Sequence, residues 1–152
     1  MKSLFRITAL CLSLSAGMAQ ASDDPTEKDA IAMVEKGAAM VKSKGKEEVF
    51  KLIAAKDAEF LNGSLYMYAR DLKSGKVLAH PINPAIVGKD LIDVPDTNGK
   101  IFRREIVELA AKSGSGWVDY TYKNPLTGKV EPKTTYVLRV DDIVLEAGIY
   151  KK

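Results

Sequence analysis

The sequence predicts an α+β domain built on a single five-stranded antiparallel sheet. Apolar residues recur at three- and four-residue intervals over residues 31–41, which is typical of an amphipathic helix. Residues 117–122 instead alternate between the two sides of the chain, which is typical of a strand. Two helical segments come first, followed by two strands, a long loop with a helix, and three more strands. This order favours an α+β fold.

The helical segments open the domain over about residues 24–57. Asp24 is the predicted N-cap of the first helix, because Pro25 follows it at the position where proline suits a first helical turn. Gly45 is predicted to end this helix. A second, shorter helix is predicted from Lys46 to about Asp57.

The first strand of the sheet domain, which covers about residues 64–150, begins at Ser64. Successive side chains of a strand point to opposite faces of the sheet. Two sets of three side chains therefore lie back to back: Leu65, Met67 and Ala69 against Tyr66, Tyr68 and Arg70. A second strand over residues 76–80 is expected to pair with the first as a hairpin.

A long loop and three further strands follow. Residues 81–99 contain several prolines and are predicted to form an ordered loop, and loops of this length are often functional. A helix is predicted over about residues 100–112, ending at Gly114. The last three strands are predicted at residues 117–122, 133–140 and 143–150.

Residues 1–21 are predicted to be a cleavable signal peptide, so that the domain covers residues 22–152. Lys2 and Arg6 give a positively charged start, a short apolar stretch follows, and residues 19–21 have the small-residue spacing of a cleavage site. The apolar stretch is shorter than the roughly 20 residues that span a bilayer. The alternative is a buried N-terminal helix. Export predicts a periplasmic location, with no membrane span in the mature form.

Composition argues against several classes of function. Lysines and arginines number 23 against 20 acidic residues, and cleavage removes Lys2 and Arg6, so the mature chain is close to neutral and no nucleic-acid partner is indicated. The lone cysteine, Cys11, lies in the predicted signal peptide. The mature chain is therefore expected to lack disulfides and thiol chemistry.

Two tyrosines and a lysine are the strongest indication of a ligand site. Tyr120 and Tyr122 project from one face of a strand, and the next strand is expected to bring Lys133 beside that face. Phenol hydroxyls together with an ammonium group suit a carboxylate. The alternatives are aromatic core packing and a solvated lysine. Trp117 points to the opposite face, where it is expected to pack against the N-terminal helix.

His80 is the only histidine, so a zinc or copper site is not indicated and no cofactor is expected. An enzyme would have to use His80 with Tyr120 or Lys133 for proton transfer, but no nucleophile or orienting acid stands at a recognisable spacing. If His80 touches the ligand, binding is expected to vary across its titration near about pH 6–7. Residues 93–99 lack the further oxygen ligands of a calcium loop, and we interpret residues 96–99 as a turn.

A series of short motifs runs through residues 45–150. They are LAHPINP at 78–84, GKDL at 88–91, Asp96 with Gly99-Lys100, GSGWVDYTY at 114–122, Asn124-Pro125 to Lys133, Tyr136-Val137 and GIY at 148–150. In this order the motifs resemble the single Cache domain in its second subtype, a PAS-like extracytoplasmic sensor module. Each motif is weak by itself, and the shared order carries the resemblance.

The resemblance implies a PAS/Cache-like sheet with the N-terminal helix on one face and the loop-helix crossover over the other. The family binds small organic acids such as acetate, propionate, pyruvate and lactate between the sheet and that crossover. Tyr68, His80 and Asn83 are then further candidates for ligand contact. The alternatives are a structural histidine at the strand end and turn chemistry at Asn83. Arg70 could bind a carboxylate through two hydrogen bonds but ranks lower, because a side chain at a strand end is often exposed. Whether Arg70 and Tyr66 reach the pocket is left open.

The sequence therefore predicts a periplasmic sensor domain that binds a C2–C4 monocarboxylate without converting it. Most family members hang between two membrane spans of a receptor, whereas this chain shows no second span. The expected partners are the acid and a membrane-bound signalling or transport protein, and a homodimer through the N-terminal helix is left open. The alternative function is a protein-interaction accessory module, which predicts an exposed apolar stripe along residues 31–41 and a pocket filled by its own side chains.

Overall fold

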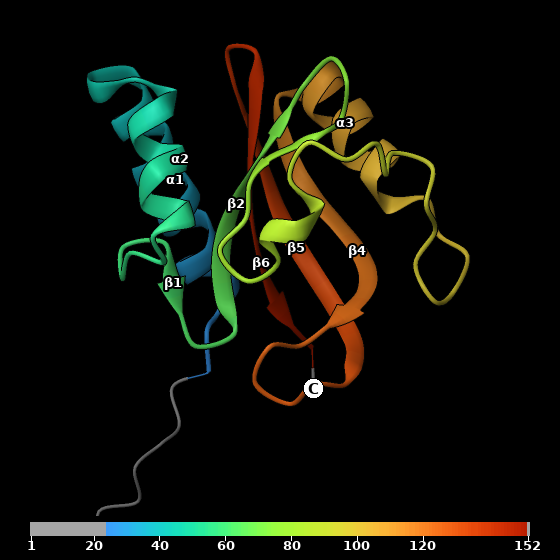
Figure 1. Ribbon diagram of the computed structural model, residues 1–152. Coiled ribbons are helices and arrows are strands. Elements are labelled where there is room, and N and C mark those ends of the chain that lie inside the picture. The colour runs from blue at the N-terminus through green and yellow to red at the C-terminus, as the bar shows by residue number, and fades with distance from the viewer. Residues whose placement is uncertain (1–23, 152) are drawn as a thin grey trace, which may run out of the picture.

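The computed structural model describes residues 24–151 (Figure 1). The predicted signal peptide, residues 1–21, and Cys11 lie outside the described residues. Two helices, α1 (Glu27–Lys44) and α2 (Lys46–Ala54), open the domain. Gly45 ends α1, as predicted, and its φ of 88° is in the left-handed region that glycine adopts without strain.

Both helices differ from the prediction at one end. The N-cap of α1 is Thr26, not Asp24, because Thr26 and Asp29 form a reciprocal capping box: the Thr26 N–H donates to Asp29 Oδ2 over 2.8 Å, and the Asp29 N–H donates to Thr26 Oγ1 over 3.3 Å. Helix α2 ends at Ala54, before the predicted Asp57. Lys56 has a φ of 59°, a left-handed conformation that a helix does not continue through.

The sheet has six strands, all paired antiparallel. They are β1 (Leu61–Asn62), β2 (Leu65–Asp71), β3 (Val77–Ala79), β4 (Ser115–Lys123), β5 (Val130–Val140) and β6 (Ile143–Tyr150). The order is β1-β2-β6-β5-β4, with β3 also paired to β2. The predicted α+β class and antiparallel sheet are confirmed. The prediction of five strands missed β1, whose two residues are too few to show an alternating pattern.

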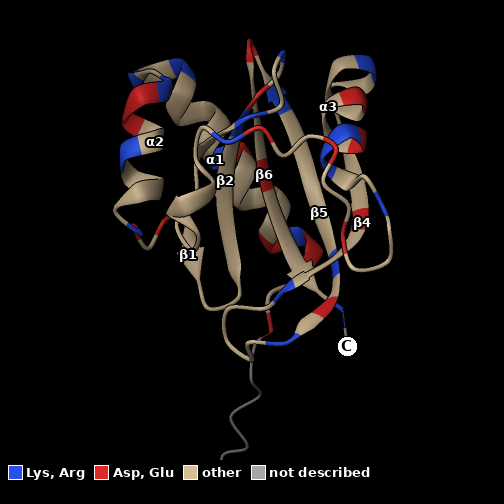
Figure 2. Cartoon of the chain, turned by 45° about the vertical axis from the view of Figure 1, so that its right-hand side comes forward, with Lys and Arg blue, Asp and Glu red and all other residues tan. Residues whose placement is uncertain are grey.

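The sheet lies between two layers. Figure 1 shows α1 and α2 on one face, and the long loop with α3 (Phe102–Ser113) on the other. Between α1, α2 and the sheet lies an apolar core that includes Val34, Ile53, Met67 and Leu145. Trp117 is half-buried against this core, as expected. The helices and loops carry most of the charged residues, and the strands carry fewer (Figure 2).

The loop between β3 and α3 is tied to the sheet at both ends. It contains a short 3-10 helix, η1 (Pro84–Ile86), and the Gly88 N–H donates to the Val77 carbonyl of β3 over 2.8 Å. Near its other end, the Asp96 carboxylate accepts backbone N–H groups of Asn98, Lys100 and Thr121 over 2.8–2.9 Å. Residues 96–99 form the predicted turn, and Asp96 holds that turn against β4.

Candidate ligand-binding site

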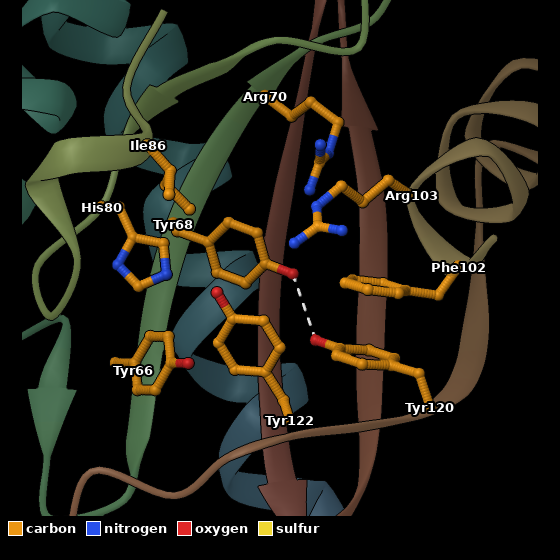
Figure 3. A pocket seen from close by; sticks show the side chains of 9 residues that line it. All are labelled: Tyr66, Tyr68, Arg70, His80, Ile86, Phe102, Arg103, Tyr120 and Tyr122. Atoms are coloured by element: carbon orange, nitrogen blue, oxygen red, sulfur yellow. Dashed lines mark hydrogen bonds between the residues drawn. The ribbon is translucent and has the colours of Figure 1, made fainter. Parts of the chain in front are cut away.

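The side chains that face α3 and the loop enclose a cavity of about 10 Å³. This volume holds about one water molecule. Figure 3 shows the side chains that line it. They come from β2, the end of β3, η1, the start of α3 and β4: Tyr66, Tyr68, Arg70, His80, Ile86, Phe102, Arg103, Tyr120 and Tyr122.

Hydroxyl groups form a short chain across the floor of the cavity. The hydroxyls of Tyr68 and Tyr120 lie 3.3 Å apart, and the Tyr120 hydroxyl lies 2.9 Å from Oγ1 of Thr135. The Phe102 ring stacks on Tyr120 with centroids 4.0 Å apart and planes at 6° (Figure 3). Burial raises the pKa of both Tyr68 and Tyr120, so both phenols stay neutral and can donate a hydrogen bond.

Lys133 lies on the same sheet face, directly opposite Tyr120 in the pairing of β4 with β5. Its side chain is 1% exposed, and its Nζ has no hydrogen-bond partner in the part of the chain that the structure describes. The Nζ is instead surrounded by rings, 4.0 Å from the centroid of Tyr66, 4.9 Å from Tyr150 and 5.8 Å from Tyr122. Burial lowers the pKa of Lys133 to about 7, although Glu146 acts in the opposite direction.

A glycine makes room for this lysine. A Cβ atom on Gly148 would lie 2.8 Å from Cε of Lys133 and 2.2 Å from Oγ1 of Thr135. Any side chain at position 148 would therefore displace the ammonium or break the hydroxyl chain. This explains why the GIY motif at 148–150 begins with glycine.

Arg70, whose place was left open by the sequence, is buried and lines the cavity. Its Nε donates to Glu146 Oε1 over 2.8 Å, its Nη2 lies 3.5 Å from Glu146 Oε2, and its Nη1 donates to the Gly75 carbonyl over 2.7 Å. Burial alone would lower the pKa of Arg70, but Glu146 and Tyr68 outweigh it and the pKa is raised. Arg70 and Glu146 are 1% and 0% exposed, so the pair is held away from solvent.

The sequence analysis did not predict three of the lining residues, Ile86, Phe102 and Arg103, of which Arg103 is the charged one. It is 7% exposed, its Nη1 donates to the Val94 carbonyl over 3.0 Å, and its Cζ lies 4.3 Å from the centroid of the Phe102 ring. Arg103 stands three residues before Ile106 and seven before Ala110, both buried. This helical spacing on the inward face was the signal that could have identified it.

His80 has a fixed tautomer and stays neutral. Its Nδ1 accepts the backbone N–H groups of Ile82 and Asn83 over 3.1 and 2.9 Å, so the proton of the neutral ring is on Nε2. The ring lies 5.2 Å from both Tyr66 and Tyr68, centroid to centroid. Burial, with smaller contributions from Lys133 and the two arginines, lowers the pKa of His80 to about 3. The expected titration near neutral pH is therefore wrong.

The structure brings together most of the residues predicted from sequence. Four of the six predicted residues line the cavity: Tyr68, His80, Tyr120 and Tyr122. Tyr66 also lines it, and Lys133, which is not among the lining residues, has its Nζ 4.0 Å from the centroid of the Tyr66 ring. Asn83 does not line the cavity. It is the N-cap of η1, where its backbone N–H orients His80.

Comparison with known families shows to which family the chain belongs. Residues 26–151 match the family model Single Cache domain 2. The chain belongs to this family. Cache sensor domains of chemotaxis receptors are non-catalytic modules that bind ligands outside the cytoplasm. In residues 24–151, no group of three or more His, Cys, Asp or Glu side chains could hold a metal ion, and none of the helices described there has the length and apolar character needed to cross a membrane.

Relatives of this Cache domain are parts of chemotaxis proteins. It is 32% identical over 72 residues to the methyl-accepting chemotaxis protein McpP of Pseudomonas putida, covering 47% of this chain and 13% of McpP. The periplasmic sensor domain of a chemotaxis protein superposes with a TM-score of 0.65 at 27% identity, covering 82% of this chain and 90% of that one. A Cache chemosensory domain, solved to explain carboxylic acid recognition, superposes with a TM-score of 0.65 at 22% identity, covering 82% and 88%.

Proposed function

We propose that this Cache domain is a periplasmic sensor that binds a C2–C4 monocarboxylate without converting it. One observation carries the proposal: the ammonium of Lys133 is buried beside the cavity and has no hydrogen-bond partner among the described residues. A buried ionised group without a partner is strongly unfavourable in a folded protein. A ligand carboxylate would supply the missing acceptor.

The charges around the cavity favour an anion. Of the buried charged side chains in residues 24–151, three are basic and one is acidic: Arg70, Arg103, Lys133 and Glu146. Glu146 neutralises Arg70 through their ion pair. Lys133 and Arg103 remain without a carboxylate partner, and neutral tyrosine hydroxyls and the Nε2–H of His80 add donors.

The small volume of the cavity means that binding requires movement. A space of about 10 Å³ is too small for even acetate, so a ligand must displace part of the wall. Ile86 belongs to the loop that covers the sheet, and its 3-10 helix contributes no buried residue. Outward movement of this loop is the least costly opening, because few packed side chains would be lost.

The alternative function, a protein-interaction accessory module, is favoured by that same small cavity, since it predicts a pocket filled by its own side chains. Its second sign is not found in α1. Met33, Val34, Gly37 and Ala38 are buried there. The exposed positions between residues 31 and 41 are Ala32, Glu35, Lys36 and Ala39, which form no stripe of large apolar side chains.

The sensor proposal extends to location and partners. It includes cleavage of residues 1–21, a periplasmic location, and a membrane-bound signalling or transport protein that reads the bound state. The similarity to the domain solved for carboxylic acid recognition is one of fold, so the proposed ligand class depends on the residues of this chain. Homodimer formation through α1 stays a prediction.

A thermal-shift screen of C2–C4 monocarboxylates tests the proposal. A specific ligand raises the unfolding midpoint of the wild type as its concentration exceeds its dissociation constant. We expect Lys133→Met to abolish the shift and Lys129→Met, at an exposed lysine on the β4–β5 turn, to retain it. The proposal fails if no acid shifts the wild type and mass spectrometry of the purified protein detects no bound acid.

A further inference from the structure

Glu146 occupies an unusual position for a carboxylate. It lies on β6, in the middle of the sheet, opposite Tyr68 on β2 and Val137 on β5. It is 0% exposed, and its two oxygens engage the Nε and Nη2 of Arg70. The remaining donor side of Arg70 is directed to the Gly75 carbonyl. Arg70 lines the cavity, yet its charge is paired with Glu146 and three of its five N–H groups have partners within the protein.

The negative charge of Glu146 also acts on other groups around the cavity. Burial raises the pKa of Tyr68 and of Tyr120, and the charge of Glu146 raises both further. At Lys133 burial lowers the pKa, and the charge of Glu146 partly offsets this effect. A charge that disfavours ionisation of two neighbouring phenols equally disfavours a second carboxylate on a ligand. The first carboxylate still finds Lys133 and Arg103, neither of which forms an ion pair with an acidic side chain within residues 24–151.

Stability does not explain why this ion pair is buried. Buried ion pairs can often be replaced by apolar side chains without loss of stability, because taking both charges out of water offsets their attraction. The pair is therefore better explained by what it does to the ligand site.

We propose that Glu146 restricts the site to ligands with one negative charge, by neutralising Arg70 in the cavity wall and by repelling a second carboxylate. This inference rests on the proposed function. It assigns Glu146 as a positioning and specificity residue that does not contact the ligand itself. Monocarboxylates, including those with a hydroxyl or keto group, are accepted, and dicarboxylates are rejected.

Pyruvate and oxalate make a matched pair for the test, because they are similar in size and shape and differ in charge. Isothermal titration calorimetry gives the ratio of their affinities for the wild type, Glu146→Gln and Glu146→Asp. We expect the wild type to prefer pyruvate. Glu146→Gln should move the ratio toward oxalate by about tenfold, or about 1.4 kcal/mol. Glu146→Asp, which keeps the charge, should keep the preference.

A double variant separates repulsion from the release of Arg70. Arg70→Met with Glu146→Leu removes both charges and is expected to move the ratio toward oxalate by less than Glu146→Gln does. If Glu146→Gln does not fold, the double variant carries the test. A purely structural role for Glu146 changes the affinities for both acids together and leaves their ratio unmoved.

The two proposals fail in different ways. If pyruvate binds the wild type and the ratio is the same in every folded variant, the role of Glu146 is overturned and the sensor proposal stands. If neither acid nor any other monocarboxylate binds the wild type, the proposed function fails and the role of Glu146 fails with it.

Discussion

The two faces of the sheet are built from the same strands but differ in chemistry. On β2, Leu65, Met67 and Ala69 enter the apolar core beneath α1 and α2, whereas Tyr66, Tyr68 and Arg70 line the cavity beneath α3 and the loop. The larger apolar cluster lies on the helix side, and a smaller one on the α3 side includes Phe102, Ile106 and Val137. The opposite face holds a buried ion pair and a buried ammonium that has no hydrogen-bond partner among residues 24–151.

The difference shows which face serves stability and which serves binding. Burial of apolar side chains is the main favourable term in folding, and α1 and α2 provide it. Buried charges contribute little to stability or reduce it. A domain that buries several charged side chains on one face is less stable because of them. Ligand recognition explains why these charges are present. Substitutions on the two faces should therefore have opposite consequences.

The largest expected effect is on the helix side. Ile53→Ala removes a fully buried side chain from the core between α2 and the sheet. We expect the free energy of unfolding to fall by about 2–5 kcal/mol, measured by urea denaturation, with ligand affinity unchanged. Val130→Ala, at a residue that is 52% exposed, is the control and should change stability by less than about 0.5 kcal/mol. A loss of binding in folded Ile53→Ala would contradict the division between the faces.

Lys133→Met should have the opposite effect on stability. It replaces a buried ammonium by an apolar side chain of similar length, and we expect the free energy of unfolding at pH 7 to rise by about 1–3 kcal/mol while ligand binding is lost. The pKa of Lys133 is 10.5 in the unfolded chain and is lowered to about 7 in the folded state. The free energy of unfolding is therefore reduced at pH values below 10.5.

The penalty at Lys133 has a defined pH window. It is full below about pH 7 and disappears as the pH rises toward 10.5, because the unfolded chain then also loses the proton. The stability gain of Lys133→Met should therefore shrink between pH 7 and pH 10. A folded variant that is less stable than the wild type at pH 7 would show that the ammonium has a structural role.

The sequence predicted those site residues that belong to a pattern within one strand. It did not predict those whose position depends on a contact with a residue far away in the chain. Alternation along a strand placed Tyr120 and Tyr122 on one face with Lys133 beside it, and the family resemblance added Tyr68. Arg70 and Glu146 were not paired, because they are 76 positions apart in the chain and only the pairing of β2 with β6 brings them together. The burial of Arg103 likewise depends on the Val94 carbonyl of a loop whose path the sequence did not define.

The pH dependence of binding sharpens the assignment of Lys133. Its ammonium form binds the carboxylate, so affinity should be constant well below pH 7 and fall by about tenfold per pH unit above it. Tyr66, Tyr150 and His80 near Lys133 do not titrate in this range. The pKa of Tyr66 is raised, that of Tyr150 is raised to about 12, and that of His80 is lowered to about 3.

Calorimetry between pH 6 and 9 measures this profile. Buffers of different ionisation enthalpy give the number of protons taken up with the ligand, which should approach about one above pH 8 as Lys133 is reprotonated. Lys129→Met should show the wild-type profile. An affinity that is constant from pH 6 to 9 would mean that Lys133 is not the counter-ion of the ligand.

The smallest expected effect is at His80, whose protonation state should not change between pH 8 and pH 5. Burial, with the positive charges of Lys133, Arg70 and Arg103, holds the pKa of His80 at about 3. The imidazole NMR signals of this single histidine should therefore not move between pH 8 and pH 5. Because the unfolded chain takes up this proton near pH 6.5, stability should fall as the pH drops from about 6.5 toward 3. A midpoint near pH 6 in the NMR titration would show that the cavity is open to water, and that the two faces differ less in burial than their contacts indicate.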